Sequence, residues 1–111
     1  LDLVEELDAA GVPLFGITNF SHEFWPPFRA REAHIFDRFR DIVVSGEERL
    51  VKPDPAIFHL ARDRFGLAKG AGLFLDDRHD NAAAAHAHGF VGHHFTDAAA
   101  ARAAIRAQGL L

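Results

Sequence analysis

The sequence predicts an α/β fold in which helices cover both faces of a parallel sheet, giving three layers. Short apolar runs of strand length alternate along the chain with segments whose apolar residues recur at helical spacing. Strands that alternate with helices of about ten residues are typical of parallel sheets joined by right-handed crossovers. The predicted helices span residues 1–10, 29–40, 55–65, 80–88 and 97–109, and the predicted strands span residues 12–20, 41–46, 72–77 and 90–96.

The first helix and the first strand are separated by a glycine. Leu3 and Leu7 fall on one face of the helix, and Gly11 is a natural end for it. The apolar run VPLFGITNF that follows has the length of a strand. These signals place the first strand early in the chain.

A segment rich in prolines comes next. Trp25, Pro26 and Pro27 predict a rigid loop over residues 21–28, anchored by the aromatic side chain and able to contact substrate. The following segment, residues 29–40, carries three apolar residues on one helical face. We therefore expect a loop and then one continuous helix.

The second half of the chain repeats the alternation. The β-branched run DIVVSG is too short for a helix and predicts a strand buried on both sides. Asp54 and Pro55 suit the start of a helix, and Gly66 suits its end. Two more apolar runs enclose an alanine-rich helix, and Asp97 can cap a last one.

Composition narrows the classes of function. The 111 residues make about one domain, and a net charge of −4 does not favour nucleic acid or an anionic membrane as a partner. The absence of cysteine excludes disulfides and thiolate chemistry, and it fits a reducing, cytoplasmic compartment. No apolar run reaches the roughly 20 residues of a membrane span. The first residues lack the basic region of a signal peptide, and an opening leucine suggests an excerpt or a processed chain.

Polar side chains lie where three of the predicted strands end. Thr18 and Asn19 end the first strand, Lys52 lies in the loop after the second, and Asp76 and Asp77 end the third. Ligands of open parallel sheets bind beyond the carboxyl ends of the strands. The order of the elements therefore predicts that these residues share one rim.

The chemistry of these residues is complementary. Adjacent carboxylates are costly to desolvate unless a cation neutralises them, and carboxylates with open positions suit Mg²⁺. A lysine and a hydroxyl suit the oxygens of a phosphoryl group. The set predicts a site for phosphoryl transfer, where positioning and charge do most of the work.

Three motifs resemble the C-terminal half of haloacid dehalogenase-like hydrolases. GITNFS looks like the second motif of that family, SGEERLVKPDPAIF like the third, and LFLDDRHDNAAAAHAHG like the acidic fourth. The resemblance runs from about Val12 to Thr96, with the motifs in family order and at family spacing. It implies a Rossmann-like core, hydrolysis of a small phosphorylated substrate, and Mg²⁺ as cofactor.

The resemblance also implies a role for each residue of the rim. Thr18 would be the phosphate-binding hydroxyl with Asn19 beside it, and Lys52 would be the lysine of the third motif. In family members with the pattern DD-x-x-x-N, the second aspartate binds magnesium directly. That role would fall to Asp77. The same pattern implies that Asp76 acts through water or indirectly, and that Asn81 orients the acidic loop.

One motif of the family has no counterpart in this sequence. The first motif, D-x-D-x-T/V, supplies the nucleophilic aspartate, and no D-x-D occurs here. In the family it precedes the cap, and its strand lies at the centre of the sheet between the first two and the last two strands seen here. We therefore expect residues 1–111 to be the C-terminal portion of one core domain that lacks this strand and the cap. An unpaired strand edge is a liability, so we also expect the isolated chain to fold poorly without the upstream part.

Several residues have purely structural interpretations as well. The two aspartates could form a turn before a helix that Asp80 caps, Lys52 could be a solvated loop lysine, and Thr18 could satisfy a backbone group. Eight histidines invite a zinc interpretation, but no pair has the i, i+4 helical spacing that favours chelation. His79 lies beside the acidic pair, where it could touch substrate, but exposure to solvent is expected.

Three other functions fit parts of the pattern. Hydrolysis of 2-haloacids uses the same fold without magnesium, but dehalogenases of the family lack the acidic pair. A non-catalytic phosphatase-like domain, as in a bifunctional epoxide hydrolase, would continue into a second domain. A signalling receiver domain has similar residues, but its acidic pair comes first in the chain and its lysine last, which is the reverse of the order here.

Overall fold

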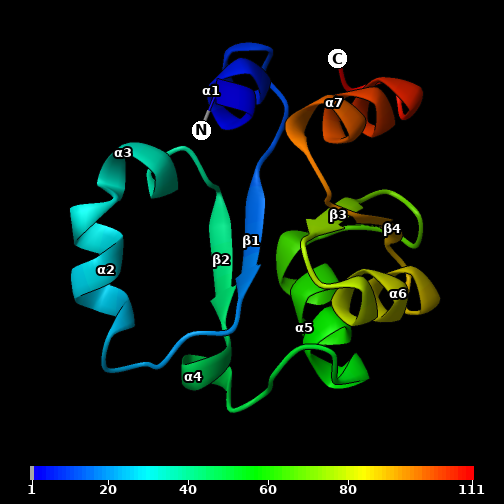
Figure 1. Ribbon diagram of the computed structural model, residues 1–111. Coiled ribbons are helices and arrows are strands. Elements are labelled where there is room, and N and C mark those ends of the chain that lie inside the picture. Colours follow the sequence, from blue (N-terminus) through cyan, green and yellow to red (C-terminus); the bar gives the residue numbers. More distant parts are fainter. Residues whose placement is uncertain (1) are drawn as a thin grey trace. The chain divides into compact units, whose positions relative to one another are not determined.

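Figure 1 shows the computed structural model of the chain, which describes residues 2–111. The helices are α1 (Asp2–Ala9), α2 (Trp25–Arg31), α3 (Ala33–Phe36), α4 (Ser45–Glu48), α5 (Pro55–Phe65), α6 (His79–Ala87) and α7 (Ala98–Ala107). The strands are β1 (Phe15–Thr18), β2 (Asp41–Val44), β3 (Leu73–Asp76) and β4 (Val91–His94). The predicted α/β class is confirmed.

The chain divides into two compact units, Leu1–Val51 and Lys52–Leu111, which are described one at a time. Each unit holds one two-stranded parallel sheet, β1 with β2 in the first and β3 with β4 in the second (Figure 1). The prediction of parallel strands is therefore confirmed. The strands are four residues long, shorter than the apolar runs that predicted them.

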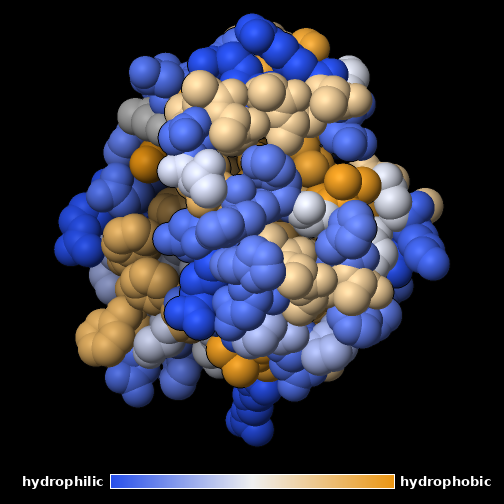
Figure 2. Space-filling view, turned by 45° about the vertical axis from the view of Figure 1, so that its right-hand side comes forward, coloured by the Kyte–Doolittle hydropathy of each residue, from blue (hydrophilic) through white to orange (hydrophobic). Residues whose placement is uncertain are grey.

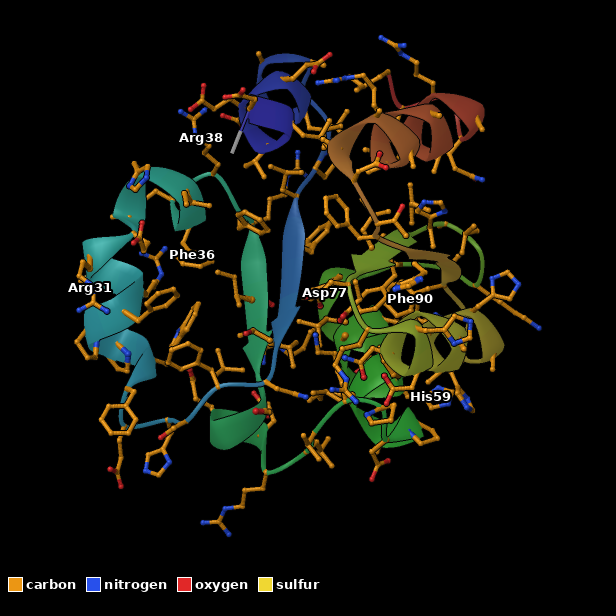
Figure 3. All side chains as sticks on the ribbon, in the orientation of Figure 1. Arg31, Phe36, Arg38, His59, Asp77 and Phe90 are labelled. Atoms are coloured by element: carbon orange, nitrogen blue, oxygen red, sulfur yellow. The ribbon has the colours of Figure 1, made fainter. Side chains whose placement is uncertain are left out.

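The segment that holds the aromatic cluster of the first unit forms two helices, so the prediction of a loop and one continuous helix is wrong. Helix α2 begins at Trp25 inside the predicted loop, because its two prolines occupy the first turn, where no backbone N–H is needed. The helical conformation is interrupted at Glu32, which separates α2 from α3. The Trp25 ring is buried and packs edge-on against Phe36 and Phe20 at centroid distances of 5.0 and 5.6 Å. Figure 3 labels Phe36, whose ring also meets Phe28.

The second strand is also shorter than predicted. It ends at Val44, and the residues Ser45–Glu48 turn into the short helix α4. Val43 and Val44 are buried, as expected for a strand covered on both sides. The polar Ser45 that follows bonds to the backbone of the loop after β1 instead of extending the sheet.

In the second unit, helices α5 and α6 pack with β3 and β4 around a core of apolar rings. Phe58 of α5 is fully buried and meets Phe74 and Phe90, the latter labelled in Figure 3, at centroid distances of 5.5 and 6.2 Å. Gly92 allows α6 to approach β4, because a Cβ there would overlap the carbonyl oxygen of Ala82. The small residues of α6 and β4 thus set how closely the helix covers the sheet.

The predicted ends of α5 and the predicted cap of α7 are confirmed, whereas α6 begins at His79, so Asp80 lies in its first turn and does not cap it. The Asp54 carboxylate accepts a hydrogen bond from the Ala56 N–H at 2.9 Å, and Gly66 ends α5 with a φ of +68°. Asp97 caps α7 by accepting from the Ala100 N–H at 2.7 Å.

Hydrophobic and hydrophilic residues are interspersed on the surface shown in Figure 2. The large apolar residues with the greatest exposure are Phe24 and Val51 in the first unit and Leu110 in the second. None of the helices over residues 2–111 has the length and apolar content of a membrane span.

Candidate active site

The clearest polar cluster of the second unit surrounds the carboxylate of Asp76, the last residue of β3. Its Oδ2 atom accepts hydrogen bonds from Lys52 Nζ at 2.7 Å and from Asn81 Nδ2 at 3.2 Å. Its Oδ1 atom accepts from the Arg78 N–H at 2.9 Å. The side chains of Lys52 and Asp76 are only 11% and 7% exposed, so this ion pair is largely shielded from water.

These contacts determine the ionisation of Asp76. Burial raises the pKa of the Asp76 carboxyl, but the hydrogen bonds from Lys52, Arg78 and Asn81, together with the ammonium charge, outweigh that effect. The net result is a pKa below the ordinary value of 3.8. Asp76 is therefore an anion at neutral pH, held in one orientation by three donors.

Asp77 differs from Asp76 in the exposure and in the hydrogen bonding of its side chain. It follows directly after β3 (labelled in Figure 3), its side chain is exposed, and its carboxylate makes no hydrogen bond or ion pair with residues 2–111. Its backbone carbonyl lies 2.9 Å from His94 Nε2. The acidic pair thus combines one carboxylate that is fully engaged with one that is available to a ligand.

Asn81 links the acidic loop to helix α6. Asn81 is only 2% exposed, and its Nδ2 donates to Asp76. Its Oδ1 is buried and has no hydrogen-bond partner among residues 2–111. A buried acceptor without a donor is costly, so a cation or a donor that reached it would remove this cost.

The donor set fits magnesium in its chemistry. Residues 2–111 hold no cluster of three or more His, Cys, Asp or Glu side chains suited to a metal. The free carboxylate of Asp77 and the unpaired amide oxygen of Asn81 are hard oxygen donors, which Mg²⁺ prefers. Because Mg²⁺ keeps several waters, it needs only one or two carboxylates from the protein.

Thr18 and Asn19 belong to the first unit. Thr18 ends β1 opposite Val44, and the exposed Asn19 begins the loop that follows. The structure brings together Lys52, Asp76 and Asn81, with Asp77 adjacent in the chain. The prediction that Thr18 and Asn19 share a rim with them stays a prediction.

Two residues that sequence reasoning did not single out hold the loop after β1. Ser45 Oγ accepts from the Phe20 N–H at 2.9 Å, and the Gly46 N–H donates to the Phe20 carbonyl at 2.9 Å. A Cβ at residue 46 would overlap His22 N and the Phe20 carbonyl oxygen, so only glycine allows this approach. The signal in the sequence was the Ser-Gly pair directly after a buried strand.

A pocket of about 450 Å³ opens beside this loop within the first unit. Asn19, Ser21 and Ser45 contribute polar groups, and Leu50 and Val51 contribute apolar ones. Arg49 also lines it, in a left-handed conformation with a φ of 57°. The residue after Thr18 therefore lines a pocket that has both polar and apolar walls.

Similarity to known proteins identifies the family of the chain. The family model of haloacid dehalogenase-like hydrolases matches residues 1–89. The chain belongs to this family. The candidate site residues Thr18, Lys52 and Asp76 all lie within the matched segment.

Similar proteins include a phosphatase and a protein of known structure. The chain is 34% identical over 100 residues to a sesquiterpene phosphatase of Aspergillus oryzae, covering 88% of this chain and 50% of that protein. The chain therefore spans half the length of that relative. An uncharacterized protein from Corynebacterium glutamicum is 26% identical, with a TM-score of 0.76 and coverage of 98% of this chain and 80% of that one.

A second structural neighbour was solved with ligands. It is a haloacid dehalogenase family enzyme from Bacteroides thetaiotaomicron, an aspartate-to-alanine variant in complex with magnesium and inorganic phosphate. It is 19% identical, with a TM-score of 0.73, covering 87% of this chain and 52% of that one. At this identity the likeness shows the fold.

Proposed function

We propose that the protein is a magnesium-dependent phosphatase of a small phosphorylated metabolite. The observation that carries the proposal is the pairing of Lys52 with an ionised Asp76 next to the unpaired carboxylate of Asp77. A fixed ammonium beside a free carboxylate suits a bound phosphoryl group and a divalent cation at the same time.

In this proposal Lys52 binds the phosphoryl group and Asp76 fixes the position of Lys52. The ammonium has three N–H donors, one of which contacts Asp76. We propose that Lys52 also donates to the phosphoryl oxygens. Thr18 and Asn19 contribute further hydrogen bonds to the same group. A rigidly held donor costs little reorganisation when charge develops in the transition state.

Asp77 is the proposed metal ligand, and Asn81 orients the acidic loop through its bond to Asp76. Bound Mg²⁺ supplies positive charge that offsets the charge of the transferring phosphoryl group. The division of roles follows from the hydrogen bonds: Asp76 has both oxygens engaged, whereas the Asp77 side chain has neither engaged.

The proposed nucleophile is an aspartate of the whole protein that lies upstream of residues 1–111. Its carboxylate oxygen attacks phosphorus, the bond to the ester oxygen of the substrate breaks, and the freed alcohol takes up a proton. Water then attacks the aspartyl-phosphate, releases inorganic phosphate and restores the carboxylate. Residues 1–111 are accordingly proposed as the C-terminal portion of one core domain, with the upstream part of the same chain as their partner.

The comparisons support this choice of reaction. One similar protein is a sesquiterpene phosphatase, and one structural neighbour is in complex with magnesium and phosphate. The acidic pair distinguishes the proposal from hydrolysis of 2-haloacids, a reaction that needs no divalent cation to offset a phosphoryl charge.

The test is release of phosphate by the whole protein from a panel of phosphomonoesters that includes an isoprenoid phosphate. We expect turnover with Mg²⁺, loss of turnover on chelation, and recovery when Mg²⁺ is added back. Release of halide from 2-haloacids in a chelator, without release of phosphate from any ester, would contradict the proposal.

A further inference from the structure

The peptide bond between Asp77 and Arg78 is held from both of its polar ends. Its carbonyl oxygen, on Asp77, lies 2.9 Å from His94 Nε2, which comes from a residue 17 positions away. Its N–H, on Arg78, donates to Asp76 Oδ1 at 2.9 Å. A peptide group with both polar atoms engaged cannot rotate without breaking one of these bonds.

The contact defines which nitrogen of His94 carries a hydrogen. A carbonyl oxygen can only accept, so Nε2 must be the donor. The His79 ring lies edge-on to the His94 ring, with centroids 5.6 Å apart, which limits how far the imidazole can swing. His94 is therefore a directed donor aimed at the acidic loop.

His94 occupies the position where the backbone ladder of β3 and β4 ends. The register pairs Asp76 with His94, and the Phe95 N–H donates to the Asp76 carbonyl at 2.7 Å. The first carbonyl after β3, that of Asp77, bonds to the His94 imidazole. The side chain of His94 thus extends the pairing of the strands by one residue, onto Asp77.

We propose that His94 is a positioning residue for the metal site, acting through the backbone of Asp77. This inference rests on the proposed function, because it assumes that the Asp77 carboxylate binds Mg²⁺. Fixing the peptide after Asp77 fixes the direction in which the carboxylate leaves the chain. Groups that orient a metal ligand typically change metal affinity by 10- to 100-fold when they are lost.

The test compares His94→Met with His94→Gln in the whole protein. The two replacements are similar in length, but only glutamine keeps an N–H donor near the position of Nε2. We expect His94→Met to raise the Mg²⁺ concentration for half-maximal phosphatase activity about tenfold, and to leave kcat at saturating Mg²⁺ within about threefold of the original. His94→Gln should recover most of the affinity.

A binding measurement separates this role from a merely structural one. Added Mg²⁺ should raise the melting temperature of the protein. The Mg²⁺ concentration that gives half of this rise should be higher in His94→Met by the same factor. His59→Leu, which removes an exposed imidazole of α5 whose ring contacts His88, should leave the titration unchanged. If His94→Met impairs folding, His94→Val is the alternative, because valine also lacks the side-chain donor and is favoured in strands.

The outcomes distinguish this inference from the proposed function. If the unmodified protein binds Mg²⁺ and His94→Met titrates like it, or if methionine and glutamine weaken binding equally, the role of His94 is wrong and the proposed function stands. If the unmodified protein shows neither activation nor stabilisation by Mg²⁺, both are overturned.

Discussion

Replacing Asp77 with asparagine should lower kcat/KM of the whole protein for its phosphate ester by about 1,000-fold or more. The substitution keeps the size of the side chain and removes the negative charge that we assign to binding Mg²⁺. Phosphate release at saturating Mg²⁺ measures the effect. Because the Asp77 carboxylate is exposed and has no partner within residues 2–111, the melting temperature without metal should hardly change.

A matched control separates a metal ligand from a general effect of charge. Asp63 is an exposed aspartate on α5, and Asp63→Asn removes the same charge from the same unit. We expect this variant to keep full activity and its full response to Mg²⁺. An Asp77→Asn enzyme with most of its activity would show that the metal assignment is wrong.

Replacing Lys52 with methionine should destabilise the protein by about 3 kcal/mol and abolish phosphatase activity. Methionine matches the length and apolar character of the lysine stem but leaves Asp76 without its cation. The Asp76 side chain is 7% exposed, so its negative charge would remain largely shielded from water without a compensating charge. Denaturant unfolding of the whole protein at pH 7 measures the loss.

The loss should depend on pH in a defined direction. In the original protein the pKa of Asp76 lies below its ordinary value of 3.8, so the pair stabilises the fold above that pH and ceases to do so as pH falls through the lowered pKa. Without Lys52, the pKa of Asp76 should rise, because only the hydrogen bonds from Arg78 and Asn81 then oppose the effect of burial, and protonation relieves the resulting penalty. The difference in stability between the two proteins should therefore be greatest near pH 7 and shrink below about pH 4.

The double variant Lys52→Met with Asp76→Asn provides the control. It removes both charges, so we expect it to recover much of the stability at pH 7 while remaining inactive. Stability that is unchanged in Lys52→Met, at any pH, would mean that the pair is not the shielded contact described here.

The parts of the fold that the sequence predicted well depend on local chemistry. Asp54 and Gly66 define the ends of α5 through contacts with residues a few positions away, and such signals are visible in a short window. The parallel pairing of the strands followed from their alternation with helices. The start of α2 was missed because its prolines, taken as loop residues, occupy the first turn of a helix.

In the candidate site, too, some contacts could be predicted from the sequence and others could not. The sequence placed Lys52 in the loop after the second predicted strand and Asp76 at the end of the third, so their contact could be expected at one predicted sheet edge. The bonds from Ser45 to Phe20 and from His94 to Asp77 join residues 25 and 17 positions apart. No local pattern encodes such contacts, since they depend on the register of two strands and the rotamer of one side chain.

A crystal structure of the whole protein with Mg²⁺ and inorganic phosphate would test the central claim most directly. We predict that the Asp77 carboxylate coordinates the ion, and that Lys52 Nζ and the Thr18 hydroxyl both donate to one phosphate. An ion held elsewhere, or Thr18 and Lys52 facing different surfaces of the protein, would contradict the account.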